Sequence, residues 1–206
     1  MAEAKRMTGE AEGRHKGDWV KFFGTWMRHP GAMGAIAASS PRYCDEMVAQ
    51  STTHLDGPIL ELGAGLGVVT RALLRAGVEP SRITSIEFDK DFAKALAERF
   101  PEVDVICGDG LDLTETLAGR ESERFASILF AIPIVRFPQE RRRELLDHYF
   151  ERIMPGGNLT QLSYSWVPPI RADPARYATS SSPVVWANLP PARVWVYRRA
   201  QEAAAR

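Results

Sequence analysis

The chain has 206 residues, of which 45% are hydrophobic, and its 26 basic residues (Lys and Arg) equal its 26 acidic ones (Asp and Glu). This length suits one domain with a small appendage, and it is enough to bury a core without disulfides or metals. The balanced charge argues against a dedicated nucleic-acid-binding protein, which usually has a basic excess, although basic residues can still gather locally.

The cysteines and the hydropathy pattern exclude two further classes. Cys44 and Cys107 form no metal-binding spacing with each other or with the four histidines, so no metal site is predicted. Cys107 ends an apolar run, which predicts a buried structural thiol, and this weakly favours a reducing compartment. Residues 1–18 are polar and do not resemble a secretory signal, and no apolar run reaches the roughly 18 residues of a membrane-spanning helix.

The N-terminal part of the chain has a composition unlike the rest. Residues 1–17 are rich in Glu, Lys, Gly and Arg and predict a flexible leader. Residues 18–56 are expected to hold helices that act at a membrane or as a lid, and residues 57–206 to form the main domain. The segment 18–29 predicts an amphipathic helix, because its apolar side chains recur at helical spacing: Trp19, Phe22, Phe23, Trp26 and Met27. Such a helix lies in a membrane interface or covers a sheet, and both interpretations stay open.

The next segments alternate between helical and strand patterns. Residues 41–50 predict a helix with Ser40 as its N-cap and Pro41 at its first position. Strands are expected at 58–62, 82–88, 103–108, 125–132 and 156–164, and helices at 67–77, 90–100 and 138–154, with a short helix or loop at 111–119. This order predicts a parallel sheet with helices on both faces.

Two strand-like runs close the chain, at about 183–187 and 193–199. The Pro-Pro turn between them is too short for a parallel crossover, so the final strand is expected to be antiparallel.

A glycine-rich loop follows the first strand. Glu61 ends the strand, and Gly63, Gly65 and Gly67 form the turn into the next helix. Glycines permit positive φ and close approach to a ligand, and ligands bind at the carboxyl edge of a parallel sheet. The spacing departs from the dinucleotide fingerprint, and a carboxylate here would repel a pyrophosphate at the helix N-terminus. It suits a ligand with an ammonium group, such as S-adenosylmethionine, which carries a sulfonium and no phosphate.

Acids also follow the next two strands. Glu87 ends the second strand, where it can accept hydrogen bonds from ribose hydroxyls. Asp109, between Gly108 and Gly110, follows the third strand, where it can reach an adenine amino group with a backbone amide nearby. Three acids at three successive strand ends predict one site, and the alternative is that they are caps or surface acids.

This constellation resembles the class I S-adenosylmethionine-dependent methyltransferases over about residues 57–200. The resemblance implies an α/β fold with a seven-stranded Rossmann-like sheet, an antiparallel last strand, helices on both faces and an N-terminal amphipathic helical extension. It also implies S-adenosyl-L-methionine as cofactor and assigns Phe88, Gly110, Ala131 and Ser40 to its site. Ser40 belongs to a segment that closes over the cofactor in similar enzymes, although helix capping explains it equally well.

Four stretches resemble the bacterial phospholipid N-methyltransferases, which convert phosphatidylethanolamine to phosphatidylcholine: residues 22–40, 86–101, 133–157 and 186–199. The resemblance implies methylation of phospholipid head groups by a cytoplasmic protein bound peripherally to the inner face of the membrane. The N-terminal helix would contact anionic lipid.

Two departures from the family's pattern bear on head-group choice or on the number of methyl groups added. One is Ala131-Ile132-Pro133 after the fourth strand, and the other is Ser165-Trp166 after Tyr164.

Aromatic side chains are the candidates for holding the acceptor amine, because aromatic faces bind alkylammonium cations. Tyr164, at the end of the fifth strand, is the first candidate, with Trp166 beside it and Tyr43 as a weaker one. Core packing is the alternative for Trp166. No residue identifies itself as a catalytic base.

Two other functions remain. The first is an RNA adenine or protein methyltransferase with the same cofactor site. Adenine-N6 methyltransferases carry Asn/Asp-Pro-Pro-Tyr after the fourth strand, and this chain keeps only Pro133 of that motif, so nucleic acid is an unlikely partner. The second is a non-catalytic membrane-binding protein that retains the fold, against which the three acids argue.

Overall fold

The computed structural model describes residues 40–188 and 190–200, so the leader and the helix expected at 18–29 lie outside the described residues. The elements in chain order are α2 (Pro41–Gln50), β1 (Ile59–Leu62), α3 (Val68–Arg75), the 3-10 helix η1 (Pro80–Arg82), β2 (Ile83–Glu87), α4 (Lys90–Arg99), β3 (Asp104–Cys107), α5 (Leu113–Thr116), β4 (Phe125–Phe130), α6 (Gln139–Glu151), β5 (Ile153–Ser163), β6 (Tyr177–Ser181) and β7 (Arg193–Arg199). Among these elements, no helix is long and apolar enough to cross a membrane.

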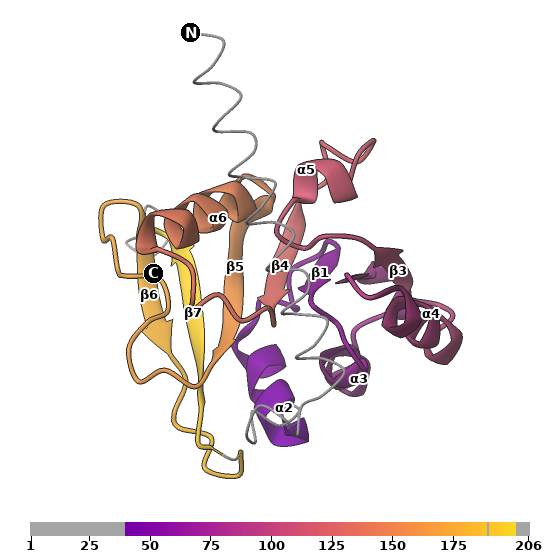
Figure 1. Cartoon of the computed structure of the whole chain (residues 1–206), viewed down its shortest axis with the longest axis horizontal. Helices are drawn as coiled ribbons and strands as arrows, with labels where there is room; N and C mark the ends of the chain where they lie inside the picture. Colours follow the sequence, from indigo (N-terminus) through magenta and orange to yellow (C-terminus); the bar gives the residue numbers. More distant parts are fainter. Residues whose placement is uncertain (1–39, 189, 201–206) are drawn as a thin grey trace, which may run out of the picture. The chain divides into compact units, whose positions relative to one another are not determined.

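The strands form one seven-stranded sheet in the order β3-β2-β1-β4-β5-β7-β6 (Figure 1). Strands β1 to β5 run parallel, and β7 is antiparallel to both of its neighbours. The expected sheet with an antiparallel last strand is therefore confirmed. The chain leaves β1 in one direction, to β2 and β3, and later continues on its other side with β4. In sheets of this kind ligands bind at such a switch point, at the carboxyl ends of the strands.

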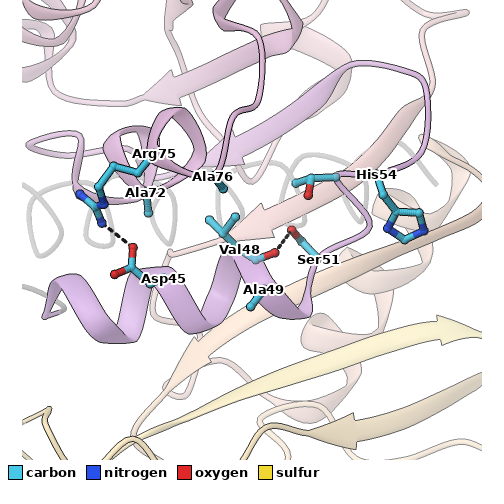
Figure 2. A pocket seen from close by; sticks show the side chains of 9 residues that line it. Asp45, Val48, Ala49, Ser51, His54, Ala72, Arg75 and Ala76 are labelled. Carbon is cyan, nitrogen blue, oxygen red and sulfur yellow. Dashed lines mark hydrogen bonds and ion pairs between the residues drawn. The ribbon is translucent and has the colours of Figure 1, made fainter.

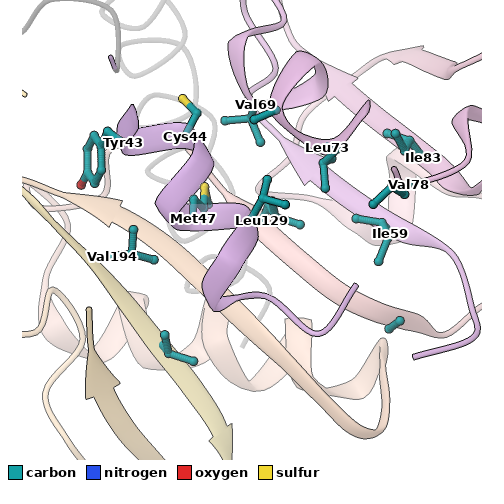
Figure 3. Packing of buried hydrophobic residues seen from close by; sticks show 14 of the residues in the cluster. Tyr43, Cys44, Met47, Ile59, Val69, Leu73, Val78, Ile83, Leu129 and Val194 are labelled. Atoms are coloured by element: carbon teal, nitrogen blue, oxygen red, sulfur yellow. The ribbon is translucent and has the colours of Figure 1, made fainter. Parts of the chain in front are cut away.

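Helices cover both faces of the sheet. Leu129 and Phe130 are neighbours in β4, so their side chains point to opposite faces. Leu129 packs in a buried cluster with Met47 of α2 and Leu73 of α3 (Figure 3). Phe130 contacts Tyr149 of α6, with ring centroids 5.1 Å apart. The sheet is thus buried between α2 and α3 on one face and α6 on the other.

Helix α2 begins and ends where the sequence predicts. The Ser40 hydroxyl accepts a hydrogen bond from the Tyr43 amide, and Pro41 occupies the first turn. The helix packs against α3, β5 and β7 in one compact unit. Tyr43 is fully buried, and its one hydroxyl hydrogen is shared between the carbonyl oxygens of Ser163 and Arg193, at 3.0 and 2.8 Å from the hydroxyl oxygen. Because these residues are paired across β5 and β7, Tyr43 ties α2 to the point where the sheet turns antiparallel.

The expected strand at 183–187 is wrong. The strand that pairs with β7 on its outer side is β6, at 177–181. In the expected run, Val185 makes an isolated bridge to Ala192. Residues 183–187 belong to the connection between β6 and β7. The edge strand β6 pairs on one side alone and carries polar residues, so its pattern lacks the apolar run of a central strand.

Two smaller expectations also fail. The helical pattern predicts a helix over 138–154, but α6 ends at Glu151. Ile153 therefore begins strand β5 instead of belonging to the helix. Cys107 is exposed rather than buried. Its strand, β3, lies at the edge of the sheet, where both of its ends face solvent.

Replacing Tyr43 by Phe is expected to lower the free energy of unfolding by about 1–3 kcal/mol, because the carbonyl oxygens of Ser163 and Arg193 and the Ser163 amide lose a buried partner. Urea denaturation measures the change. Arg42→Ala, at an exposed position of the same helix, is the matched control and should lie within about 0.5 kcal/mol of wild type. Equal stability of the Tyr43→Phe protein would contradict the anchoring role.

Candidate functional site

The glycine loop lies between β1 and α3, at the carboxyl edge of the sheet. Gly63, Gly65 and Gly67 all have positive φ, of 80°, 54° and 73°. A Cβ atom at Gly67 would lie 2.6 Å from side-chain atoms of both Leu96 and Phe100, so this glycine also lets α3 approach α4 closely. The loop conformation therefore depends on residues without side chains.

Glu61 is fully buried, and its carboxylate is held by residues of α3 and β2. Its Oε1 accepts from the Thr70 amide at 3.2 Å, and its Oε2 accepts from the hydroxyls of Thr70 and Ser85 at 2.6 and 2.7 Å. Burial raises the pKa of Glu61, and these hydrogen bonds oppose the rise. The carboxylate thus caps the start of α3, which was the alternative interpretation that the sequence left open for this acid. Its role toward a cofactor ammonium stays a prediction.

Glu87 fixes the loop from the second strand. Its Oε2 accepts from the Gly65 amide at 2.8 Å, and its Oε1 accepts from the Asp89 amide at 2.8 Å. Burial raises the pKa of Glu87, and the Asp89 and Gly65 amides oppose the rise. A carboxylate can accept about four hydrogen bonds, so Glu87 can hold the loop and still accept from a ribose hydroxyl.

Asp109 lies in the turn after β3, partly exposed, and its Oδ1 accepts from the Leu111 amide at 2.9 Å. Beside it, Gly110 lies against Ile132, whose Cδ1 would be 2.8 Å from a Cβ atom at that position. The Cγ1 atom of Ile132 would equally lie 2.8 Å from a Cβ atom at Gly63. Ile132 therefore bridges the turns that follow β1, β3 and β4, and it brings the predicted cofactor residues Gly63, Gly110 and Ala131 into one region.

The remaining candidates are Phe88, predicted to bind the cofactor, and Ser40, Tyr43 and Tyr164. Phe88 directly follows Glu87 in the turn after β2. Ser40 and Tyr43 are used in the structure itself, Ser40 as the cap of α2 and Tyr43 as its anchor. Tyr164 directly follows β5, is half-buried, and packs edge-on against Tyr43 with ring centroids 6.1 Å apart.

Trp166 lies two residues after Tyr164 and is not in the core, so the alternative of core packing is wrong for it. Its side chain is 63% exposed, and the Arg193 guanidinium lies 5.7 Å from its ring centroid. Because a cation already lies beside the Trp166 ring, Tyr164 stays the first candidate for the acceptor amine.

Sequence reasoning missed the residues that hold the acids. Thr70 and Ser85 read as ordinary polar residues of a helix and a strand, yet both are buried against Glu61. Their only signal is position, since Thr70 is on the first turn of α3 and Ser85 is paired with Glu61 between β1 and β2.

A cavity of about 480 Å³ lies between α2 and α3 (Figure 2). It is lined by the last turns of both helices and the loop after α2, including Asp45, His54, Ala72 and Arg75. The glycine loop precedes the first turn of α3, so this cavity lies at the opposite end of the helix and is separate from the predicted cofactor site.

The residues at the carboxyl edge fit S-adenosylmethionine. Glu61, Glu87 and Asp109 place carboxylates beside the glycine loop, and burial of the first two strengthens their effect on a nearby cation. The arrangement disfavours a phosphate and favours an ammonium and a sulfonium. Within the described residues, no group of His, Cys, Asp and Glu is arranged to hold a metal ion.

The sequence matches a known protein family and is similar to a lipid-modifying enzyme. Residues 59–157 match the family described as a methyltransferase domain. An ornithine lipid N-methyltransferase from Singulisphaera acidiphila is 31% identical over 154 residues, which cover 73% of this chain and 80% of that protein.

Two further proteins match over a shorter segment or by fold alone. A ribosomal RNA small subunit methyltransferase A from Chlorobium phaeobacteroides is 35% identical over 106 residues, which cover 50% of this chain but only 38% of that protein. The crystal structure of TrmN from Thermus thermophilus superimposes with a TM-score of 0.59 at 16% identity, over 85% of this chain and 52% of that one, which shows a shared fold.

The two roles of Glu61 can be separated by substitution. Glu61→Gln keeps groups that can bond Thr70 and Ser85 but removes the charge, so it should melt near the wild-type temperature and bind S-adenosylmethionine at least about tenfold more weakly. Glu61→Ala should in addition lower the melting temperature. Calorimetric titration and thermal melts measure both effects. Glu79→Gln, exposed at the opposite edge, is the control. If the Glu61→Gln protein bound S-adenosylmethionine as tightly as wild type, the role of Glu61 would be structural only.

Cofactor affinity should also fall with pH through Glu87. Because the pKa of Glu87 is raised, protonation begins at a higher pH than for an ordinary glutamate and removes an acceptor for the ribose. A raised folded-state pKa means that protonation of Glu87 favours the folded protein, so protonation of this group does not itself cause unfolding. Titrations from pH 7.5 to 5, with circular dichroism at each pH, measure this. Glu87→Gln should bind weakly at every pH, and an unchanged pH dependence in this variant would contradict the assignment.

Proposed function

The chain belongs to the class I S-adenosylmethionine-dependent methyltransferases, and we propose that it transfers methyl groups to the amine of phosphatidylethanolamine head groups at a membrane surface. Its cofactor is S-adenosyl-L-methionine. The similarity to an ornithine lipid N-methyltransferase carries the proposal, because it extends over four fifths of that protein. The name of that protein describes methylation of a nitrogen atom in a lipid. The four stretches that resemble phospholipid N-methyltransferases support the choice of phosphatidylethanolamine.

When bound, the cofactor supplies an electrophilic methyl group on a positive sulfur. The task of the protein is then mainly alignment, since the departing sulfur is neutral. Glu87 and Gly65 hold the glycine loop in a fixed shape, and Ile132 packs against the turns around it. These contacts support the proposal that the residues predicted to bind the cofactor are held in place before any ligand arrives.

The acceptor amine must lose a proton before it reacts. An alkyl amine titrates near 10 in water, and transfer into a partly buried site lowers its pKa. Tyr164 offers an aromatic face at the end of β5, packed against Tyr43, which is a surface that suits an alkylammonium before and after methylation. In this proposal Tyr164 orients the amine, and burial lowers the pKa of the ammonium so that solvent water takes its proton, without a dedicated base on the protein.

The second candidate is methylation of RNA, which the similarity to a ribosomal RNA methyltransferase supports over half of the chain. The segment after β4 offers a planar base little to bind. Ala131 and Ile132 have no hydrogen-bonding side chain, and no aromatic residue follows Pro133 directly. The balanced overall charge also gives no general attraction to nucleic acid. Exclusion of nucleic acid as a partner stays a prediction.

The membrane location is part of the same proposal. We place the enzyme at the inner face of the cytoplasmic membrane, with the segment 18–29 in contact with anionic lipid. Removal of residues 1–29 is then expected to weaken vesicle binding more than cofactor affinity.

The direct test is transfer of radiolabelled methyl groups to vesicles of phosphatidylethanolamine, followed by thin-layer separation of the lipids. We expect labelled mono-, di- or trimethylated phosphatidylethanolamine and no label in RNA. Ornithine lipid vesicles and ribosomal RNA are the parallel substrates. Label that appears in RNA alone would replace the proposal by the second candidate, and label in ornithine lipid alone would correct the head group.

Tyr164→Leu should lower kcat/KM for lipid about 3- to 30-fold, which corresponds to the roughly 0.5–2 kcal/mol of a cation–aromatic contact. Tyr164→Phe keeps the ring and is the matched control. Cofactor affinity should be unchanged in both variants. Equal loss in the Leu and Phe variants would assign the effect to the hydroxyl rather than to the aromatic face.

A further inference from the structure

The turn after β3 is held by hydroxyl groups from two helices. Asp109 and Gly110 lie in this turn, and the main-chain carbonyl oxygens of both accept hydrogen bonds from side chains. The Thr116 hydroxyl of α5 donates to the Asp109 carbonyl at 2.9 Å, and the Tyr149 hydroxyl of α6 donates to the Gly110 carbonyl at 2.9 Å. Because Tyr149 stands 39 positions beyond Gly110, the shape of a turn predicted to receive adenine depends on a helix that is distant in the sequence.

Tyr149 has a fixed position in the core. It is 1% exposed, and its ring packs edge-on against Phe130, the last residue of β4, with ring centroids 5.1 Å apart. Burial raises the pKa of Tyr149 well above its usual value, so the hydroxyl keeps its hydrogen at neutral pH. The Gly110 carbonyl is therefore bound by a donor that is shielded from solvent and stays protonated.

The bond between Tyr149 and Gly110 reaches across much of the sheet. In the strand order β3-β2-β1-β4, β3 lies at the edge and β4 is the third strand beyond it. Gly110 follows β3, yet a Cβ atom at this position would lie 3.5 Å from Leu62 Cβ, at the end of β1, and 2.8 Å from Ile132 Cδ1, after β4. The turn thus extends from β3 to the end of β1, and Tyr149 holds its far end from the side of β4.

One peptide unit connects Tyr149 with the Asp109 carboxylate. The Gly110 carbonyl and the Leu111 amide belong to the same planar unit, in which the C=O and N–H groups point in opposite directions. The Tyr149 hydroxyl binds the carbonyl, and the Leu111 amide donates to Asp109 Oδ1 at 2.9 Å. Fixing the carbonyl therefore fixes the direction from which the Asp109 carboxylate is held. Without the Tyr149 bond the unit could rotate, and the orientation of Asp109 would be less restricted.

We propose that Tyr149 is a positioning residue for adenine recognition: through the peptide unit between Gly110 and Leu111, it orients the Asp109 carboxylate toward the amino group of the adenine ring. The inference rests on the predicted place of Asp109 in the cofactor site, and it deepens the cofactor half of the proposed function without involving the acceptor. Because Tyr149 is buried, it acts through Asp109 and not on the ligand directly. A ligand that lacks the amino group should therefore not respond to the loss of the Tyr149 hydroxyl.

The test compares two ligands by calorimetric titration of the full chain. One is S-adenosylhomocysteine, and the other is its 6-deamino analogue, which has a hydrogen atom in place of the adenine amino group and keeps the ring nitrogens. Wild type should prefer the first ligand by about tenfold or more, because the second leaves Asp109 without a donor. Tyr149→Phe keeps the ring and should lower this preference about three- to tenfold, through weaker binding of S-adenosylhomocysteine alone.

Two further variants serve as controls. Tyr197→Phe is matched, since Tyr197 of β7 is also fully buried and its hydroxyl accepts from the Ile170 amide at 3.3 Å. It should keep the wild-type preference, with thermal melts reporting any loss of stability in both tyrosine variants. Asp109→Ala tests the route of the effect: it should abolish the preference by itself, and adding Tyr149→Phe to it should then change the affinity for neither ligand.

An unchanged preference in Tyr149→Phe would overturn the inference, as would an equal loss in Tyr197→Phe or a further loss of affinity in the double variant. A full preference in Asp109→Ala would overturn it even if Tyr149→Phe did not fold. The titrations contain no acceptor, so a failure to methylate phosphatidylethanolamine would refute the proposed function and leave this inference standing. A wild-type protein that binds neither ligand would refute the cofactor site and the inference together.

Discussion

Two buried carboxylates hold the glycine loop, and the rest of the site depends on that restraint. Glu61 binds the first turn of α3 through Thr70, and Glu87 binds the middle of the loop through the Gly65 amide. Burying a carboxylate costs free energy unless hydrogen bonds replace the lost water, and here each acid has several donors. A loop made of glycines would otherwise sample many backbone conformations, so the acids convert a permissive sequence into one shape.

The same restraint gives the site its electrostatic preference. Carboxylates that serve the fold cannot turn away into solvent, so their charge remains beside the loop when a ligand arrives. A cationic nucleoside lowers the cost of keeping that charge buried, and a pyrophosphate would raise it. The same carboxylate oxygens therefore stabilise the fold and favour a cationic ligand. Only a substitution that removes the charge and keeps the hydrogen bonds can separate the effect on stability from the effect on ligand binding.

The sequence predicted the sheet, the position of α2 and the strand ends that carry the acids, because these features follow from local patterns: period, capping and glycine spacing. It did not predict that Thr70 and Ser85 bind Glu61, since that contact joins three elements and depends on register. Edge strands caused the remaining errors. Strand β6 is polar and was missed, while the apolar run at 183–187 was mistaken for it, and Cys107 is exposed because β3 has no neighbour on one side. The apolar run expected of a central strand does not identify an edge strand, because an edge strand pairs with a neighbour on one side alone.

The carboxyl edge of the sheet divides between β1 and β4. On the side of β1 to β3, the buried acids Glu61 and Glu87 lie where a cation is expected. On the side of β4 to β7, Tyr164 follows β5 and packs against Tyr43, and it is the residue proposed for the acceptor amine. The turn after β4, with Ile132 packed against Gly63 and Gly110, lies where the two halves meet. Because β4 lies between β1 and β5, an amine held at Tyr164 in the proposed function would approach the cofactor across this turn, so a substitution of Ile132 would affect the cofactor loop and the path of the acceptor together.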